Sequence, residues 1–446
     1  MAAAFCVDPS PHVANDAHSW WHPILSPARP LLFVLSYSAT PVATPLVPRR
    51  VIAQNGRMQD SSAAGDAGAA ATIAIAGLTA LAVAMGIGRF AFTPVMPMME
   101  ADAGLTLRAA GWLAAANYLG YLLGALCAAR LSFGQAVRGG LLLIAVATFA
   151  MGVTHAFALQ LVLRLVAGIA SAWVLVHVSA WALNGLLSLR RADAAGILYA
   201  GVGIGVAAAG LIVMATMQLR MDSDRTWQLL GGLSLLAALA LWRVLRGPRA
   251  APAPPAAEGV RSRIRWTADE RRLTWCYGAL GIGYIIPATY LPDMAHRFVS
   301  NPQVFGLAWP VFGATSALST WIAARWLAQV DDRKLWAICY VFMAAGCALP
   351  ALWPTFAAIL GSALLVGGTY MVVTMLGLRE ARRAAGTEAT AFIAVMTAAF
   401  AIGQIIGPLL VSAVAHLPHG FSSTLLAAAV VVMLAAISLW RSTRRA

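Results

Sequence analysis

Long apolar stretches follow one another along this chain from about Ala69 to Trp440. A helix of roughly 20 mainly apolar residues is long enough to cross the hydrocarbon core of a bilayer. The chain is 60% hydrophobic and only 11% charged, whereas a soluble domain has roughly a quarter of its residues charged. We therefore expect an all-α membrane protein that crosses the bilayer many times, rather than a soluble protein with a large core.

Twelve transmembrane helices are predicted, six in each half of the chain. They cover about 74–98, 107–129, 137–154, 157–183, 195–217 and 227–246, and then 273–295, 304–328, 335–353, 355–378, 389–415 and 421–440. These spans define an N-terminal bundle, 69–246, and a C-terminal bundle, 273–440. Residues 1–68 are predicted to be a disordered cytoplasmic tail, 247–272 a cytoplasmic linker and 441–446 a second short tail. A further hypothesis is that translation begins near Met58.

The two halves repeat one another at an offset of 281 − 86 = 195 residues. Gly86–Met99 corresponds to Gly281–Met294, since both segments begin with Gly-Ile-Gly and end with Pro-x-Met. The register continues to Ala128-Ala129-Arg130, which falls on Ala323-Ala324-Arg325. Gly- and Pro-interrupted spans at matching positions of two repeated halves point to the binding site of a transporter. The repeat therefore predicts two pseudo-symmetric six-helix bundles around a central site.

The basic residues give the chain a net charge of +14, but they are dispersed over short loops and form no single patch. A nucleic-acid partner is therefore not expected. If the N-terminus lies inside, the outer side contains only Arg108, Arg220, Arg225 and Arg297, and the other loop arginines face the cytoplasm. This distribution follows the positive-inside rule. It predicts a multi-pass protein of the bacterial inner membrane with both termini in the cytoplasm.

The sequence contains no recognisable enzyme motif or metal site. GxSxG, HExxH and GxxxxGK[ST] are absent, and lone Gly-x-Gly pairs inside apolar spans are not nucleotide loops. The five cysteines are scattered, and His416 and His419 have no third ligand nearby. We expect no enzymatic activity, no cofactor and no bound metal.

The two six-span halves and the long central linker resemble the major facilitator superfamily. The motif Gly86-Ile-Gly-Arg-Phe-Ala-Phe-Thr-Pro94 is similar to the signature of its bacterial YbfB/YjiJ-like branch, and Asn117-Tyr-Leu-Gly-Tyr121 agrees. The resemblance covers about 70–440 and implies the fold and mode of action of the superfamily, but no substrate. The loop 129–138 departs from the superfamily because it lacks the Asp of the acidic/basic motif, which Asp331-Asp332-Arg333-Lys334 keeps. The gating latch that this motif provides is therefore questioned for the first half.

Arg89 is the foremost candidate for substrate binding. Its repeat counterpart Tyr284 lies 12 residues after Arg272, which is about 18 Å along a helix and close to the middle of the bilayer. A charge at that depth costs at least about 2.5–3.5 kcal/mol and normally faces a cavity or a partner. We predict that Arg89 binds a carboxylate or phosphate of the substrate, with Phe92 and Thr93 on the same helix face. The alternative is a structural arginine that hydrogen-bonds backbone carbonyls freed by the Gly/Pro breaks.

Other polar side chains at membrane depth complete the predicted site. Those assigned to substrate binding are Asn117, Tyr121, Arg164, Tyr284 and Gln404, and those also noted at this depth are Tyr199, Tyr290, Tyr370 and Thr374. Some should line a cavity, and others should only join helices. For Arg164 the resemblance implies a role in proton coupling, and interhelical hydrogen bonding is the alternative.

Two residues are candidates for titrating a coupling proton. His177 is a histidine well inside a span and can titrate near neutral pH, although a packing histidine is the alternative. Asp293 lies near the predicted outer end of its span, where a solvated loop carboxylate is the alternative.

These features predict a secondary active transporter that moves a small organic solute, anionic or zwitterionic, across the inner membrane by alternating access. Its partners would be the solute, the lipid bilayer and protons as the candidate coupling ion, and no oligomeric state is predicted. The alternatives are an exporter of neutral or cationic compounds, in which Arg89 is structural, and a receptor that does not transport.

Overall fold

The computed structural model describes residues 66–191, 194–246, 266–296, 298–299, 301–327, 329–385, 389–414, 416–417 and 420–443. All of them belong to one compact unit, Gln59–Ala446. Most of the predicted N-terminal tail with Met58, most of the linker 247–272, and residues 444–446 lie outside the described residues.

The first half contains six long helical segments, as the sequence predicts. They are Asp66–Asp102, which includes the π-helix η1 (Ala82–Phe90) and α2 (Phe92–Asp102), then α3 (Leu107–Cys127), η3 (Gln135–Gly139) continuing into α4 (Gly140–Met151), α5 (Phe157–Ser188), α6 (Ala195–Gln218) and α7 (Ser223–Leu241). The short helices η2 (Ala128–Arg130) and η5 (Val244–Arg246) follow α3 and α7. The first segment begins at Asp66, so residues 66–68 of the predicted tail are helical.

The second half contains the other six long segments. They are α8 (Ala268–His296), α10 (Ala308–Trp326), α11 (Asp332–Leu352), α12 (Phe356–Ala385), α13 (Ala389–Val414) and α14 (Gly420–Thr443), with the one-turn α9 (Pro302–Phe305) before α10. No strand occurs among the described residues. In that part of the chain, eight helices are long and apolar enough to cross a membrane by length and composition, and Gln135–Met151 is a shorter apolar helix.

Polar residues of the sequence define where several of these helices begin. Before α8, Thr267 and Glu270 form a reciprocal capping box: Thr267 N–H donates to Glu270 Oε2 at 2.9 Å, and Glu270 N–H donates to Thr267 Oγ1 at 3.1 Å. Asp331 caps α11 by accepting from Lys334 N–H at 2.9 Å. Such caps satisfy backbone donors that a helix leaves unpaired at its first turn.

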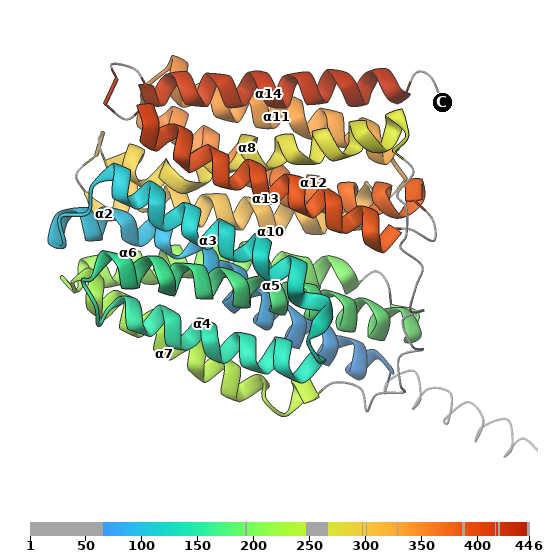
Figure 1. Cartoon of the computed structure of the whole chain (residues 1–446), viewed down its shortest axis with the longest axis horizontal. Helices are drawn as coiled ribbons and strands as arrows, with labels where there is room; N and C mark the ends of the chain where they lie inside the picture. Colours follow the sequence, from blue (N-terminus) through green and yellow to red (C-terminus); the bar gives the residue numbers. More distant parts are fainter. Residues whose placement is uncertain are drawn as a thin grey trace, which may run out of the picture. The chain divides into compact units, whose positions relative to one another are not determined.

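The helices pack in two groups that follow the halves of the sequence (Figure 1). In the first half α3 lies along α5 and α4 along α7; in the second α8 lies along α13 and α11 along α14. The halves meet where α3 packs on α13 and α6 packs on α10. The repeat equates α3 with α10 and α6 with α13, so these two inter-half contacts are counterparts. The contacts thus have the pseudo-symmetry that the sequence predicts.

Close helix contacts explain the glycines that the repeat shares. A Cβ atom at Gly86 would lie 2.3 Å from the carbonyl carbon of Gly205 on α6. A Cβ atom at Gly281 would lie 2.2 Å from the carbonyl oxygen of Phe400 on α13. Since real Cβ contacts do not come this close, only glycine allows the first helical segment and α8 to approach these neighbours.

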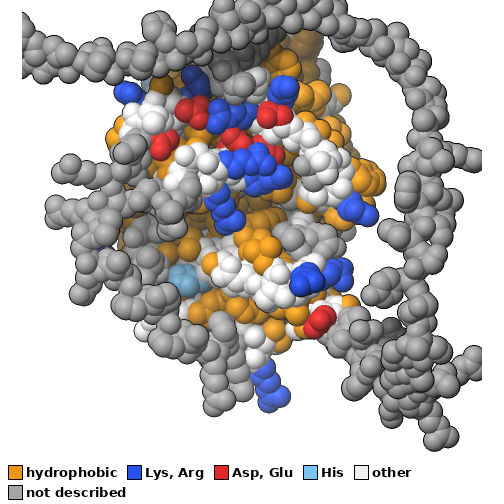
Figure 2. All heavy atoms as spheres, turned by 90° about the vertical axis from the view of Figure 1, so that its right-hand side faces the viewer, with side chains coloured by type: hydrophobic (Ala, Val, Ile, Leu, Met, Phe, Trp, Pro, Cys, Tyr) orange, Lys and Arg blue, Asp and Glu red, His pale blue; other side chains and the backbone are white. Residues whose placement is uncertain are grey.

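Charged side chains join three helices at one end of the second half. Arg333 donates to both carboxylate oxygens of Asp269 at 2.8 and 2.7 Å, and to Glu380 at 2.6 Å. Arg383 contacts Asp332 at 2.7 Å. These residues lie at the start of α8, the start of α11 and the end of α12, and Figure 2 shows acidic and basic side chains together on this face. We call this group the ion-pair cluster.

The first half has a different arrangement at the matching position. Arg138 donates from Nε to the Leu245 carbonyl at 3.1 Å, and its guanidinium lies 5.0 Å from the centre of the Trp242 ring. No ion pair is formed there among the described residues. In the first half, where the loop 129–138 lacks the Asp, Arg138 thus makes a hydrogen bond to a carbonyl and a cation–π contact in place of a salt bridge.

Candidate functional site

The first helical segment is irregular where the predicted site begins. Ala82–Phe90 is π-helical, and Ala91 is a turn residue between it and α2. In a π-helix the Arg89 carbonyl would accept from residue 94, but Pro94 has no N–H. The carbonyls of this break are instead available to side chains from neighbouring helices.

Asn117 of α3 and Arg164 of α5 bind those carbonyls. Arg164 donates from Nη2 to the Arg89 carbonyl at 3.0 Å, and from Nη1 to the Gly88 carbonyl at 3.5 Å. Asn117 donates from Nδ2 to the Gly88 carbonyl at 3.3 Å and to the Arg164 carbonyl at 2.9 Å. The contacts that we anticipated as an alternative for Arg89 are therefore made by Asn117 and Arg164, which hold the backbone of Arg89 in place.

The Arg89 side chain is buried, with 2% of its surface exposed. One guanidinium nitrogen donates to Gln404 Oε1 of α13, and Cζ lies 4.0 Å from the centre of the Tyr121 ring. The Nε atom has no hydrogen-bond partner among the described residues. No described carboxylate forms an ion pair with Arg89. An amide oxygen and a ring face do not neutralise the charge, although they reduce the cost of burying it.

Gln404 connects Arg89 in the first half to Tyr284 in the second. Its amide oxygen accepts from Arg89, and its Nε2 donates to the Tyr284 hydroxyl. The Tyr284 ring is nearly parallel to Tyr370, with centroids 5.0 Å apart and an angle of 8°, and to Phe400, at 5.8 Å and 3°. The repeat counterparts Arg89 and Tyr284 are therefore joined by one polar side chain across the two halves.

A cavity of about 570 Å³ begins at Arg89 and Tyr284, which is within the usual size range of small-molecule sites. Its aromatic residues are Phe90, Tyr121 and Tyr199 in the first half and Tyr277, Tyr284, Tyr370 and Phe400 in the second. Most of the other lining residues are aliphatic, and the charged ones are Arg89 and Arg382.

The cavity extends toward one end of the helices. Its lining includes Tyr277 near the start of α8, Arg382 near the end of α12 and Leu183 near the end of α5. Arg382 is exposed. Beyond Arg89 in the other direction, Tyr118 and Thr289 form a hydrogen bond of 3.2 Å between the halves. The cavity thus reaches the end that carries the ion-pair cluster, while the halves touch at the other side of Arg89.

The predicted substrate-binding residues divide into two groups in the structure. Arg89, Tyr121 and Tyr284 line the cavity, and Gln404 contacts two of them. Asn117, Arg164, Phe92 and Thr93 are buried but are not among the lining residues; the Arg164 guanidinium lies 5.1 Å from the centre of the Phe92 ring.

Of the two predicted coupling residues, the structure describes the side chain of His177, which lies apart from this group. His177 places Nδ1 3.0 Å from the Trp173 carbonyl and Nε2 3.2 Å from the Leu131 carbonyl, so its ring joins α5 to the loop after α3. It is not among the residues that line the cavity. The side chain of Asp293 lies outside the described part of the structure.

Several lining residues were not predicted from the sequence, although their spacing carried a signal. On α12, Leu378 and Arg382 follow Tyr370 and Thr374, which were noted at membrane depth, at intervals of four residues. On α13, Ile393, Thr397 and Phe400 lie on the face of Gln404. Because residues at such intervals share a helix face, extending the face of Tyr370 would have found Arg382.

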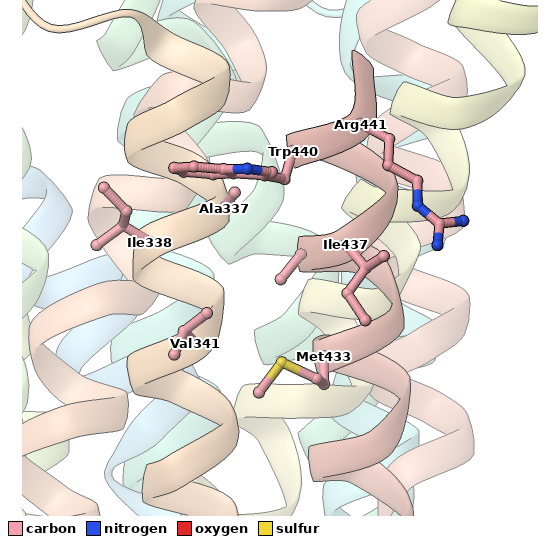
Figure 3. A pocket seen from close by; sticks show the side chains of 8 residues that line it. Ala337, Ile338, Val341, Met433, Ile437, Trp440 and Arg441 are labelled. Carbon is pink, nitrogen blue, oxygen red and sulfur yellow. The ribbon is translucent and has the colours of Figure 1, made fainter. Parts of the chain in front are cut away.

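A second hollow, between α11 and α14, lacks the polar groups of the site. Ala337, Ile338 and Val341 face Met433 and Ile437 across it. Figure 3 shows the Trp440 ring across one end of this groove and the Arg441 side chain directed away from it. Nothing in this groove would orient a polar solute, so we place the candidate site at Arg89.

Comparisons with known proteins agree with this architecture. The family described as "Uncharacterised MFS-type transporter YbfB" matches residues 81–439. A crystal structure of a bacterial homologue of the human lysosomal transporter Spinster, in an inward-facing and occupied conformation, has 15% sequence identity and a TM-score of 0.62. The match covers 82% of this chain and 96% of that one, and at this identity it shows the fold alone.

No curated protein matches the chain in sequence. The family match extends over most of the chain, from the π-helix that carries Arg89 to α14. The fold, the helices long enough to span a membrane and the family agree with one another. The chain is therefore a multi-pass membrane transporter, not an enzyme, and it belongs to the YbfB-like family of the major facilitator superfamily.

Proposed function

We propose that this protein is a secondary active transporter of small organic anions, including zwitterions with a carboxylate, and that Arg89 binds their acidic group. The supporting observation is a buried guanidinium that borders the cavity, has a free Nε and has no carboxylate partner among the described residues. A buried charge without a counter-ion is costly. A substrate carboxylate would supply that counter-ion, whereas a cationic substrate would add a second positive charge.

Alternating access is the proposed mode of action. The cavity reaches the end that carries Arg382 and the ion-pair cluster, and the positive-inside rule assigns this end to the cytoplasm. The described conformation would then be inward-facing. Rocking of the two halves about Arg89 and Gln404 would break the Tyr118–Thr289 contact and open the cavity on the other side.

A matched set of solutes tests the proposal. For each of several carbon skeletons, the acid, its amide and the corresponding amine are compared by the thermal stabilisation of the purified protein and by exchange in proteoliposomes. We expect the acids to stabilise the protein and to exchange. Arg89→Gln should abolish the preference for the acid, Arg89→Lys should keep part of it, and Arg441→Gln serves as the control because that side chain points away from its groove.

Two results would contradict the proposal. In the first, amines or amides stabilise and exchange better than acids, as an exporter of neutral or cationic compounds requires. In the second, acids bind but Arg89→Gln exchanges them as fast as the wild type does. Stabilisation without any exchange would instead favour the receptor that does not transport. Size-exclusion profiles of the variants separate a loss of binding from a loss of folding.

A further inference from the structure

We infer that the anion is an aromatic monocarboxylate, with its acid group at Arg89 and its ring among the aromatic side chains of the cavity. This inference rests on the proposed function and assigns the part of the substrate that does not carry the charge. It follows from three observations: the aromatic residues that line the cavity, how apolar the remaining wall is, and how far apart the two lining arginines lie.

The aromatic rings of the second half that line the cavity pack on one another. Tyr284 lies nearly parallel to both Tyr370 and Phe400. Tyr370 also packs on Phe312, at 5.3 Å and 24°, and Phe400 lies 5.5 Å from Tyr277 at a tilt of 41°. Tyr277, Tyr284, Tyr370 and Phe400 therefore form one continuous aromatic wall of the cavity.

An aromatic wall beside a positive charge favours a ligand ring. An aromatic ring has a negative face and a positive edge, and a ligand ring can pack on such a wall in the offset-stacked or T-shaped arrangement that aromatic pairs prefer. A cation binds to ring faces, and one face of Tyr121 is already occupied by the Arg89 guanidinium, 4.0 Å from its centre. The aromatic wall is therefore suited to an arene, and the charge of Arg89 disfavours an ammonium group beside it.

The remaining wall is too apolar for a small hydrophilic anion. Apart from Arg89 and Arg382, the polar non-aromatic lining residues are Ser179, Thr374 and Thr397. A small anion at Arg89 would leave the apolar surface of a cavity of about 570 Å³ in contact with water. A carboxylate with an attached ring would cover part of this surface and gain the corresponding hydrophobic stabilisation.

The spacing of the two lining arginines indicates one acid group. Tyr370, which stacks on Tyr284 beside the site, lies 382 − 370 = 12 residues before Arg382 on α12, about 18 Å along the helix. A small aromatic acid at Arg89 cannot reach that far. Arg382 is exposed at the cavity mouth, where its charge would attract an approaching anion without holding it at the site.

The test compares five probes with the wild-type protein by isothermal titration calorimetry: 3-phenylpropionate, 3-cyclohexylpropionate, propionate, 3-phenylpropanamide and 3-phenylpropylamine. We expect 3-phenylpropionate to bind at least about tenfold more tightly than propionate and the amide, and severalfold more tightly than the cyclohexyl acid. Phe400→Leu should reduce the preference for phenyl over cyclohexyl. Phe342→Leu should not, because Phe342 is an exposed residue of α11.

The outcomes distinguish this inference from the proposed function. If propionate or the cyclohexyl acid binds as tightly as 3-phenylpropionate and the binding requires Arg89, the aromatic substrate class is wrong and anion transport stands. If the amide or the amine binds as tightly as the acid, both are wrong. Arg382→Gln should weaken binding of 3-phenylpropionate at low salt more than at high salt and leave the acid-to-amide ratio unchanged. An equal loss at every salt concentration, together with a loss of that ratio, would place the acid group at Arg382 instead.

Discussion

Removing the Asn117 side chain tests whether the broken helix is held by hydrogen bonds from its neighbours. Asn117 is fully buried and donates from one nitrogen to two carbonyls, those of Gly88 in η1 and Arg164 in α5. It therefore joins three helices of the first half. In the variant Asn117→Ala both bonds are lost, while the backbone of α3 keeps a good helix former.

The size of the effect follows from the two bonds. Interhelical hydrogen bonds in a membrane protein contribute roughly 0.6 kcal/mol on average and up to roughly 1.7 kcal/mol. The bond to the Arg164 carbonyl is the shorter, at 2.9 Å, and the Gly88 carbonyl keeps a weak contact with Arg164 at 3.5 Å. We expect Asn117→Ala to lower the free energy of unfolding by about 1–3 kcal/mol.

The assay is reversible unfolding in mixed micelles with increasing dodecyl sulfate, followed by tryptophan fluorescence. Asn184→Ala is the matched control, because Asn184 lies on α5 but is exposed. Arg89 keeps its charge in the variant, so the preference for an acid over its amide should persist. Unchanged unfolding of Asn117→Ala would refute the structural role. Loss of the acid preference with unchanged stability would assign Asn117 to substrate binding.

Three further perturbations have definite expectations. Gln404→Glu places a carboxylate beside Arg89 that competes with the acid group of the substrate. Titration calorimetry should show that acids bind at least about tenfold more weakly and that amides bind as before. Undiminished acid binding would mean that Arg89 does not hold the acid. Gly231→Ala should lower the free energy of unfolding by about 1–3 kcal/mol, because the added Cβ would lie 2.5 Å from the backbone of α4. The adjacent Gly232→Ala is the control and should be neutral or stabilising, because its Cβ meets no atom within 4 Å. Equal unfolding of the two variants would contradict the close contact. Arg333→Gln removes the centre of the ion-pair cluster and should lower the free energy of unfolding by about 1–3 kcal/mol, between the values for exposed and buried pairs. An unchanged free energy of unfolding would show that the cluster does not stabilise the protein.

The sequence predicted the fold well because apolar length and the repeat are properties of the chain itself. The twelve predicted spans coincide with helical segments of the structure, and the family match confirms the resemblance. The ends of the helices were less accurate. α5 continues to Ser188 and α12 to Ala385, beyond the predicted ends at 183 and 378. Hydropathy finds the apolar part of a helix, but α12 continues as a charged turn beyond it, and α5 continues through Asn184 and Gly185 to Ser188.

The site was predicted only in part, because depth in the membrane does not determine direction. Asn117 and Tyr121 lie one helical turn apart on α3, and both are polar residues at membrane depth. In the structure, Tyr121 lines the cavity and Asn117 faces α5 and the broken helix. That difference depends on how α3 is rotated against its neighbours, which the pattern of polar residues in one sequence does not specify. The aromatic stack around Tyr284 combines three helices and has no signature in any one of them.

The polar chain from Arg89 to Gln404 and Tyr284 suggests how binding would be connected to movement of the halves. Arg89 belongs to the first half, and its acceptor Gln404 belongs to the second. The position that corresponds to Gln404 in the first half is 404 − 195 = 209, an alanine of α6, so the repeat supplies no second chain of this kind. A substrate carboxylate at Arg89 would compete with the Gln404 amide oxygen and would bind more strongly, because it is charged. The bond between the halves would then be exchanged for a bond to the substrate. Binding of the anion would thereby release one contact that opposes rocking, and a neutral substrate would compete less well for the Arg89 guanidinium.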